Sequence, residues 1–70
     1  MKIYVFVAGK LGEMDYKLIE AVEGIELLPD YSEYDSKWDE TEIVVKAESI
    51  DFVKDELEKL GAKISEIGEY

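Results

Sequence analysis

Cysteine, histidine, arginine, asparagine and glutamine are all missing from this chain of 70 residues. Without cysteine there is no disulfide, no thiolate metal site and no cysteine nucleophile, so the usual supports of small secreted domains are absent. Without histidine as well, acid–base or nucleophilic catalysis would need a tuned Lys, Tyr, Ser or carboxylate, and no such pairing stands out. We therefore expect a cytoplasmic protein that is not an enzyme and that needs no cofactor.

The chain also has no long hydrophobic run. Its longest, from Ile3 to Ala8, is far shorter than the ~20 apolar residues of a membrane-spanning helix and too short for the core of a signal peptide. We expect one soluble domain over residues 1–70. A domain of this size buries only about 60% of the surface that its unfolded chain exposes. Self-association, most simply as a homodimer, is therefore expected to add stability.

Positive charge is scarce: the chain has eight lysines and 18 carboxylates, which gives a net charge of −10. Such a surface repels phosphate groups, which excludes nucleic acid as a partner. The abundance of Glu and Lys without Asn or Gln is typical of hyperthermophile proteins, so the composition indicates a thermophilic source. Chance in so short a chain, or a designed sequence, are the alternatives.

The spacing of apolar residues predicts a strand-helix-strand unit that occurs twice. The first strand is apolar on both faces, as a central strand would be, whereas the third alternates an apolar face with a wetter face that carries Val44. The predicted elements are a strand at 2–8, a helix at 13–23, a strand at 25–28, a strand at 41–47, a helix at 49–60 and a strand at 63–67. Residues 68–70 follow the last strand as a tail without assigned structure.

Local signals support the two helices. Ser49 is placed to cap the second helix, and Gly24 and Gly61 each precede an apolar residue, an arrangement typical of helix C-termini. On the first helix the predicted apolar stripe consists of Met14, Leu18, Ala21 and Val22, and on the second of Ile50, Val53, Leu57 and Leu60.

Right-handed crossovers in both units give an α+β fold of the ferredoxin-like βαββαβ type. This fold has a four-stranded antiparallel sheet in the order 4-1-3-2, with both helices on one face. Pro29 then falls at the end of an edge strand, where a residue without an N–H is tolerated. The other face would carry Tyr4, Phe6 and Val44 towards water, so we expect a second copy to cover it.

The turn Gly9-Lys10-Leu11-Gly12 is the candidate ligand-binding segment. Two glycines free the backbone N–H groups for an anion, and Lys10 adds a positive charge. The segment lacks the spacing of a Walker loop, and the alternative is a plain turn between strand and helix with a solvated lysine.

The stretch from Pro29 to Glu40 combines carboxylates with three aromatic residues, Tyr31, Tyr34 and Trp38. Its spacing does not fit a calcium-binding loop, so we expect no metal site. The aromatic residues recur at helical spacing, but a long hairpin with its tip near residues 35–37 is the alternative. Their role is either to bind a partner or to cap the open end of the core.

The chain resembles an ACT-type regulatory domain in its apolar first strand, the turn Gly9 to Gly12, the helix end Glu23-Gly24-Ile25, the hairpin and the segment 57–64. The resemblance implies pairing of copies and binding of a small amino-acid-like effector near Gly9 to Gly12. Copper chaperones and acylphosphatases share the fold but are excluded, because they need a Cys pair and an Arg. The leading hypothesis is thus a domain that self-associates and binds an effector. The alternative is an acidic adaptor that docks a basic protein through residues 29–40.

Overall fold

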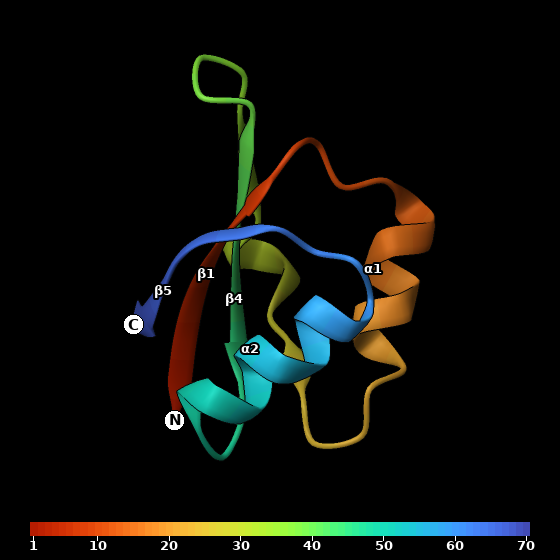
Figure 1. Ribbon diagram of the computed structural model, residues 1–70, viewed down its shortest axis with the longest axis vertical. Helices are drawn as coiled ribbons and strands as arrows, with labels where there is room; N and C mark the ends of the chain where they lie inside the picture. The colour runs from red at the N-terminus through yellow and green to blue at the C-terminus, as the bar shows by residue number, and fades with distance from the viewer.

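The strand richest in β-branched and aromatic residues, β1 (Lys2–Ala8), lies inside the sheet. The computed structural model describes residues 1–70 and has an α+β fold with two helices and one antiparallel sheet of five strands (Figure 1). The other elements are α1 (Glu13–Glu20), β2 (Glu26–Leu27), the 3-10 turn η1 (Pro29–Tyr31), β3 (Glu33–Asp35), β4 (Glu40–Lys46), α2 (Ile50–Lys59) and β5 (Ile64–Glu69).

The strands run in the order β2-β4-β1-β5, and β3 also pairs with β4. The four expected strands therefore take the predicted order, and β3 is a fifth strand that was not predicted. Leu28 separates β2 from Pro29, which begins η1. Since proline cannot donate to the ladder, the edge strand is interrupted there. The chain then returns to the edge of β4 as β3, which forms a hairpin with β4.

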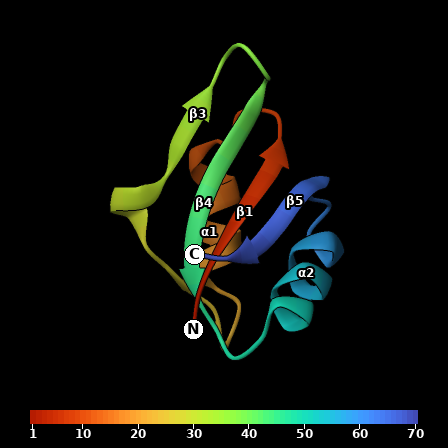
Figure 2. The same cartoon turned by 90° about the vertical axis from the view of Figure 1, so that its left-hand side faces the viewer.

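The sheet carries both helices on one side and leaves the other side open. In Figure 2 the open side faces the viewer, and α1 lies behind the strands. The hairpin of β3 and β4 extends beyond the rest of the molecule, as the green segment at the top of Figure 1 shows. Neither helix has the length and apolar content that crossing a membrane would require.

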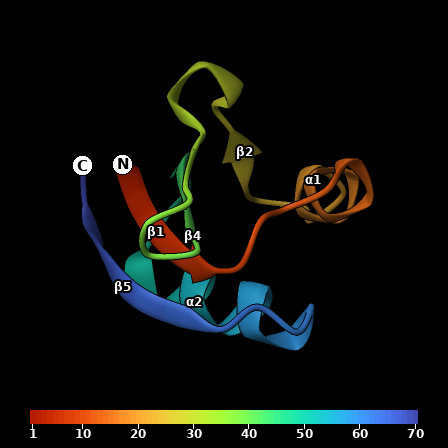
Figure 3. The same ribbon diagram turned by 90° about the horizontal axis from the view of Figure 1, so that it is seen from above.

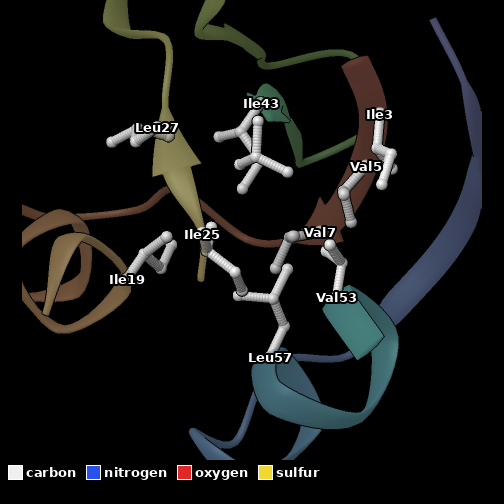
Figure 4. Packing of buried hydrophobic residues seen from close by; sticks show 10 residues of the cluster. Ile3, Val5, Val7, Ile19, Ile25, Leu27, Ile43, Val53 and Leu57 are labelled. Atoms are coloured by element: carbon white, nitrogen blue, oxygen red, sulfur yellow. The ribbon is translucent and has the colours of Figure 1, made fainter. Parts of the chain in front are cut away.

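The hydrophobic core lies between the sheet and the helices (Figure 4). Alternate residues of β1 and β4 point into it, as expected for strands with one core face. Burial of these side chains, at roughly 1.5–3 kcal/mol each, is the main favourable term in folding. The core consists of Ile3, Val5, Val7, Ile19, Ile25, Leu27, Ile43, Val45, Val53 and Leu57.

The apolar stripe predicted for α1 is only partly correct. Met14 and Leu18 are 68% and 46% exposed, and the buried residue of the helix is Ile19. The helix packs against β2 at the edge of the core, which turns Tyr16, Ile19 and Val22 inward. The sequence contains two overlapping apolar stripes at helical spacing, and only the tertiary packing determines which of them is buried.

The signals predicted for α2 are confirmed. The Ser49 hydroxyl accepts a hydrogen bond from the Phe52 N–H at 3.1 Å, which caps the helix. At the other end Gly61 has a φ of 94°, and the Ala62 N–H donates to the Leu57 carbonyl at 3.1 Å. This is the arrangement of a Schellman motif, which needs a residue with positive φ and is therefore satisfied by glycine.

The C-terminal residues belong to the sheet. β5 runs to Glu69, beyond the predicted end at residue 67. The Tyr70 N–H donates to the Lys2 carbonyl at 2.9 Å, so the segment 68–70 is held against β1.

Candidate functional site

The open side of the sheet is formed by the residues of β1 that alternate with the core. Ile3 and Val5 are fully buried beneath the helices, whereas Tyr4 and Phe6 point the other way and are partly exposed. The ring centroids of Tyr4 and Phe6 lie 5.7 Å apart in an edge-to-face arrangement. The expectation that these two aromatic residues lie on the open side is confirmed.

Two pairs of acidic residues occupy directly opposed positions on the hairpin. In the register of β3 and β4, Glu33 faces Glu42 and Asp35 faces Glu40, and Glu42 also faces Phe6 across β1. Like charges at directly opposed positions of a sheet repel one another. The ion pairs of the chain, Lys17–Glu13 and Lys59–Glu56, are both within helices, so no cation compensates these four groups.

The same carboxylates line two adjoining hollows. The larger, of about 620 Å³, is lined by Phe6, Glu33, Tyr34, Asp35, Ser36, Trp38, Glu40 and Glu42. The smaller, of about 300 Å³, is lined by Asp30, Tyr31, Ser32, Glu33, Glu42 and Tyr70. Because Glu33 and Glu42 border both, the hollows form one continuous surface, which we name the acidic aromatic face.

Two hydrogen bonds at the tip of the hairpin hold the end of this face that lies nearest to Trp38. The Tyr34 hydroxyl donates to Asp39 Oδ1 at 2.7 Å, and the Lys37 N–H donates to Asp35 Oδ1 at 2.9 Å. Asp39 has a φ of 49°, a left-handed conformation that Asp tolerates better than most residues. The hydrogen bond to Asp39 raises the pKa of Tyr34 above its usual value. Trp38 remains 68% exposed beside these bonds.

Tyr4 is fixed by two neighbours on β5. Its hydroxyl donates to Glu66 Oε2 at 2.7 Å, and this bond raises the pKa of Tyr4. Its ring lies over Gly68, where an added Cβ would come within 2.8 Å of the Tyr4 hydroxyl oxygen. Glycine at this position therefore lets the aromatic ring lie flat along the sheet.

Each of the three aromatic rings in residues 29–40 has the ammonium group of a lysine of this chain close to it. The nitrogen–centroid distances of 5.3–5.6 Å fall within the ~6 Å range of cation–π attraction. This shows that rings in the acidic stretch are accessible to cationic groups. The pairs are Lys2 with Tyr31, Lys10 with Tyr34, and Lys37 with Trp38.

The structure does not place the three predicted aromatic residues in a single row. Tyr31 lies in η1, against Tyr70 at a centroid distance of 5.5 Å. Tyr34 pairs with Thr41, a residue of the core side, and Trp38 lies at the hairpin tip. The helical spacing was misleading because residues 33–35 form a strand, and the hairpin alternative is confirmed.

Val44, the fourth predicted interface residue, has no exposed surface. It lies on the open side opposite Tyr4, but it is completely covered within the chain. The prediction that Val44 faces water is therefore wrong. Period-two alternation correctly gave its side of the sheet but not how deeply this small side chain is buried.

The turn Gly9 to Gly12 is held firmly by β4. Thr41, 1% exposed, donates its hydroxyl to the Gly9 carbonyl at 2.7 Å and accepts from the Leu11 N–H at 3.3 Å. The Gly12 N–H donates to Asp15 Oδ2 at 2.7 Å. Both glycine N–H groups thus have partners within the chain, since Gly9 donates to the Asp39 carbonyl.

Three residues of the open side, Glu42, Glu66 and Tyr70, were not predicted as site residues. Glu42 lies between the buried Thr41 and Ile43, and this alternation was the available signal. Glu66 and Tyr70 could not be found in this way, because a bulge in the pairing of β1 with β5 changes the register at Phe6 and Val7.

No group of three or more carboxylates comes together in a way that could hold a metal ion. No protein-family model matches the chain, and no curated protein or solved structure is significantly similar to it. The assignment of a function therefore depends on the side chains described above.

Proposed function

We propose that this chain is a non-enzymatic binding domain with a ferredoxin-like arrangement, extended by β3, and that it docks a basic segment of a partner protein on the acidic aromatic face. The arrangement is supported by the two strand-helix-strand units and by the strand order β2-β4-β1-β5. The docking role is supported by the charge and shape of the open side.

The observation that carries the proposal is the two pairs of opposed acidic residues, Glu33 with Glu42 and Asp35 with Glu40. Each pair disfavours the isolated hairpin. Destabilising features such as opposed like charges are concentrated at functional sites, where binding of a partner compensates for the lost stability. Lysine or arginine side chains of a partner would supply that compensation.

The aromatic residues add a second source of affinity for the same partner. Trp38 and Tyr31 are 68% and 42% exposed, and their rings already attract lysines of this chain. Aromatic residues are enriched at the centres of interfaces, and a Lys or Arg over a ring gains about 0.5–1 kcal/mol at an exposed site. Carboxylates and rings together therefore select basic side chains.

The overall charge favours rapid association. A net charge of −10 attracts a basic protein over long distances, and such steering raises association rates at low salt. The effect weakens as the ionic strength rises and the Debye length falls to about 8 Å at 0.15 M salt. Salt dependence is thus the signature of this mode of binding.

Titration with a short peptide of alternating Lys and Gly tests the proposal. The chain has one tryptophan, Trp38, so its fluorescence reports directly on the hairpin tip. We expect a change in emission on binding, and an affinity that falls steeply with salt. The double variant Glu33→Gln/Glu42→Gln should weaken binding by roughly two- to tenfold.

A matched control separates the site from the net charge. The variant Glu20→Gln/Glu58→Gln removes the same charge from exposed positions on α1 and α2. Equal weakening by the two double variants would show that the peptide responds only to total charge and would refute the docking face.

Self-association is a second candidate function, favoured by the exposed apolar residues Met14 and Leu18 on α1. A two-fold dimer through the open side would bring like carboxylates together, so the helical side is the better surface for a second copy. Sedimentation equilibrium of the wild type and of Met14→Glu tests this: the variant should be monomeric at concentrations where the wild type associates.

A further inference from the structure

A separate cavity lies on the opposite side of the sheet, between α1 and α2. In Figure 3, α1 stands to one side, away from α2. α1 packs against β2 and α2 against β5, so the space between the helices is left open. A cavity of about 280 Å³ occupies this space, close to the lower end of the ~300–1,000 Å³ typical of ligand pockets.

The cavity is apolar over most of its lining. Val7, Ile19 and Leu57 form buried parts of its wall, whereas Leu18 and Leu60 are 46% and 40% exposed. Large hydrophobic side chains that remain half-exposed around a hollow are typical of a surface that binds an apolar group.

The polar groups of the cavity give it a positive character. Lys10 and Lys63 line it, and neither takes part in an ion pair. The one carboxylate in the lining, Asp15, accepts a hydrogen bond from the Gly12 N–H at 2.7 Å and caps α1. A site with two lysines and one engaged carboxylate contrasts with the net charge of −10 of the whole chain.

Lys63 is better placed than Lys10 to bind an anionic group in the cavity. Its carbonyl accepts from the Ala8 N–H at 2.8 Å, which fixes its backbone beside the end of β1. The ammonium of Lys10 lies over the Tyr34 ring, 5.6 Å from the centroid, so this lysine also serves the hairpin. We therefore expect Lys63 to supply the larger share of any charge recognition.

We propose that this cavity binds a small molecule with an apolar body and a single anionic head group, of the chemical class of medium-chain or aromatic carboxylates. The apolar body would contact the leucine and isoleucine side chains, and the head group would lie near Lys63. The site is separate from the acidic aromatic face, so either proposal can fail without the other.

Three probes of equal chain length test the charge requirement: octanoate, 1-octanol and octylammonium. Backbone amide shifts in a nuclear magnetic resonance titration would locate each probe. We expect octanoate to shift the amides of Leu11, Ile19, Leu57 and Ala62, and to bind at least about fivefold more tightly than octylammonium. Equal or tighter binding of octylammonium at these amides would overturn the proposal, as would the absence of octanoate shifts there.

Substitution of the lysines provides the second measurement. Lys63→Met keeps an apolar side chain of similar length and should weaken octanoate binding by roughly three- to tenfold. Lys54→Met is the matched control, because Lys54 is an exposed residue of α2 that does not line the cavity. Equal affinity of the two variants for octanoate would overturn the role of Lys63 and with it the proposal of an anion site.

Discussion

Glu33 and Glu42 face each other across β3 and β4, and neither has a cationic partner. Their repulsion lowers the stability of the hairpin in the isolated protein. A bound lysine or arginine would remove that repulsion. Folding stability and partner binding are therefore expected to respond in opposite directions to changes at this pair.

The variant Glu33→Lys tests this opposition. It replaces repulsion by attraction at a cross-strand pair, so we expect the free energy of unfolding to rise by about 0.2–1 kcal/mol. Binding of the basic peptide should weaken in the same protein. Urea denaturation and fluorescence titration measure the two effects.

A double-mutant cycle of Glu33→Gln and Glu42→Gln is the control for Glu33→Lys, because it separates the interaction between the two side chains from the change in net charge. Each single variant removes the repulsion, so the double variant should gain less free energy of unfolding than the sum of the two single gains. If the gains are additive, the repulsion between Glu33 and Glu42 is not a significant term.

Thr41 is predicted to be the most sensitive polar residue of the core. Thr41→Val keeps the shape but removes the bonds to the Gly9 carbonyl and the Leu11 N–H. Unpaired buried groups cost about 1–3 kcal/mol each, so we expect a loss of stability of this order in chemical denaturation. Thr41→Ser keeps the hydroxyl and should recover a substantial part of it; a Ser variant no more stable than the Val variant would contradict the assigned bonds.

Gly68→Ala should disturb the aromatic side of the sheet. The added methyl group would lie 2.8 Å from the Tyr4 hydroxyl oxygen, so the Tyr4 ring must shift, which disturbs its bond to Glu66. The displaced atoms are at the end of a partly exposed side chain, so we expect a cost near the lower end of the ~1–3 kcal/mol that overpacking of a core causes. The comparison is Gly68→Ala in a Tyr4→Ala background, where the ring that the methyl group would meet is absent. An equal effect of Gly68→Ala on stability in both backgrounds would show that the Tyr4 ring does not lie over Gly68.

Alkaline pH should weaken the open side of the sheet. Hydrogen bonds to Glu66 and Asp39 raise the pKa values of Tyr4 and Tyr34 above the ordinary 10.0. The neutral phenols are favoured in the folded state, so their contribution to stability is present below pH 10.0 and is lost as the pH rises through the folded pKa values.

The ultraviolet absorbance of ionised tyrosine provides the measurement for this pH dependence. Tyr34→Phe should remove a step from the high-pH end of the titration curve, and the loss of stability above pH 10.0 should become shallower. A variant with the high-pH end of the curve unchanged would contradict the bond between Tyr34 and Asp39.

The two helices and the caps of α2 were predictable from the sequence because each depends on a local signal, and the strand order followed from the handedness of the two crossovers. Ser49 and Gly61 sit at fixed positions relative to α2, and the apolar character of β1 and β4 indicates central strands. β3 was not predictable. Three residues, Glu33–Asp35, form a strand only because β4 offers an unpaired edge beside them.

The candidate site was predictable only in part. The stretch from Pro29 to Glu40 stood out by composition, but its contribution to the surface depends on tertiary pairing with β4 and β1. Val44 shows the limit of alternation, which gives the side of a sheet and not the degree of burial. The cavity between the helices depends on the position of α1, which no pattern in the sequence specifies.

One measurement tests the docking proposal most directly: a nuclear magnetic resonance titration of the wild-type chain with the Lys–Gly peptide at low and at physiological salt. The account predicts amide shifts on β3, β4 and the hairpin tip around Trp38, with an affinity that decreases as salt rises. Shifts spread evenly over the helices and the sheet, or confined to α1 and α2, would contradict it.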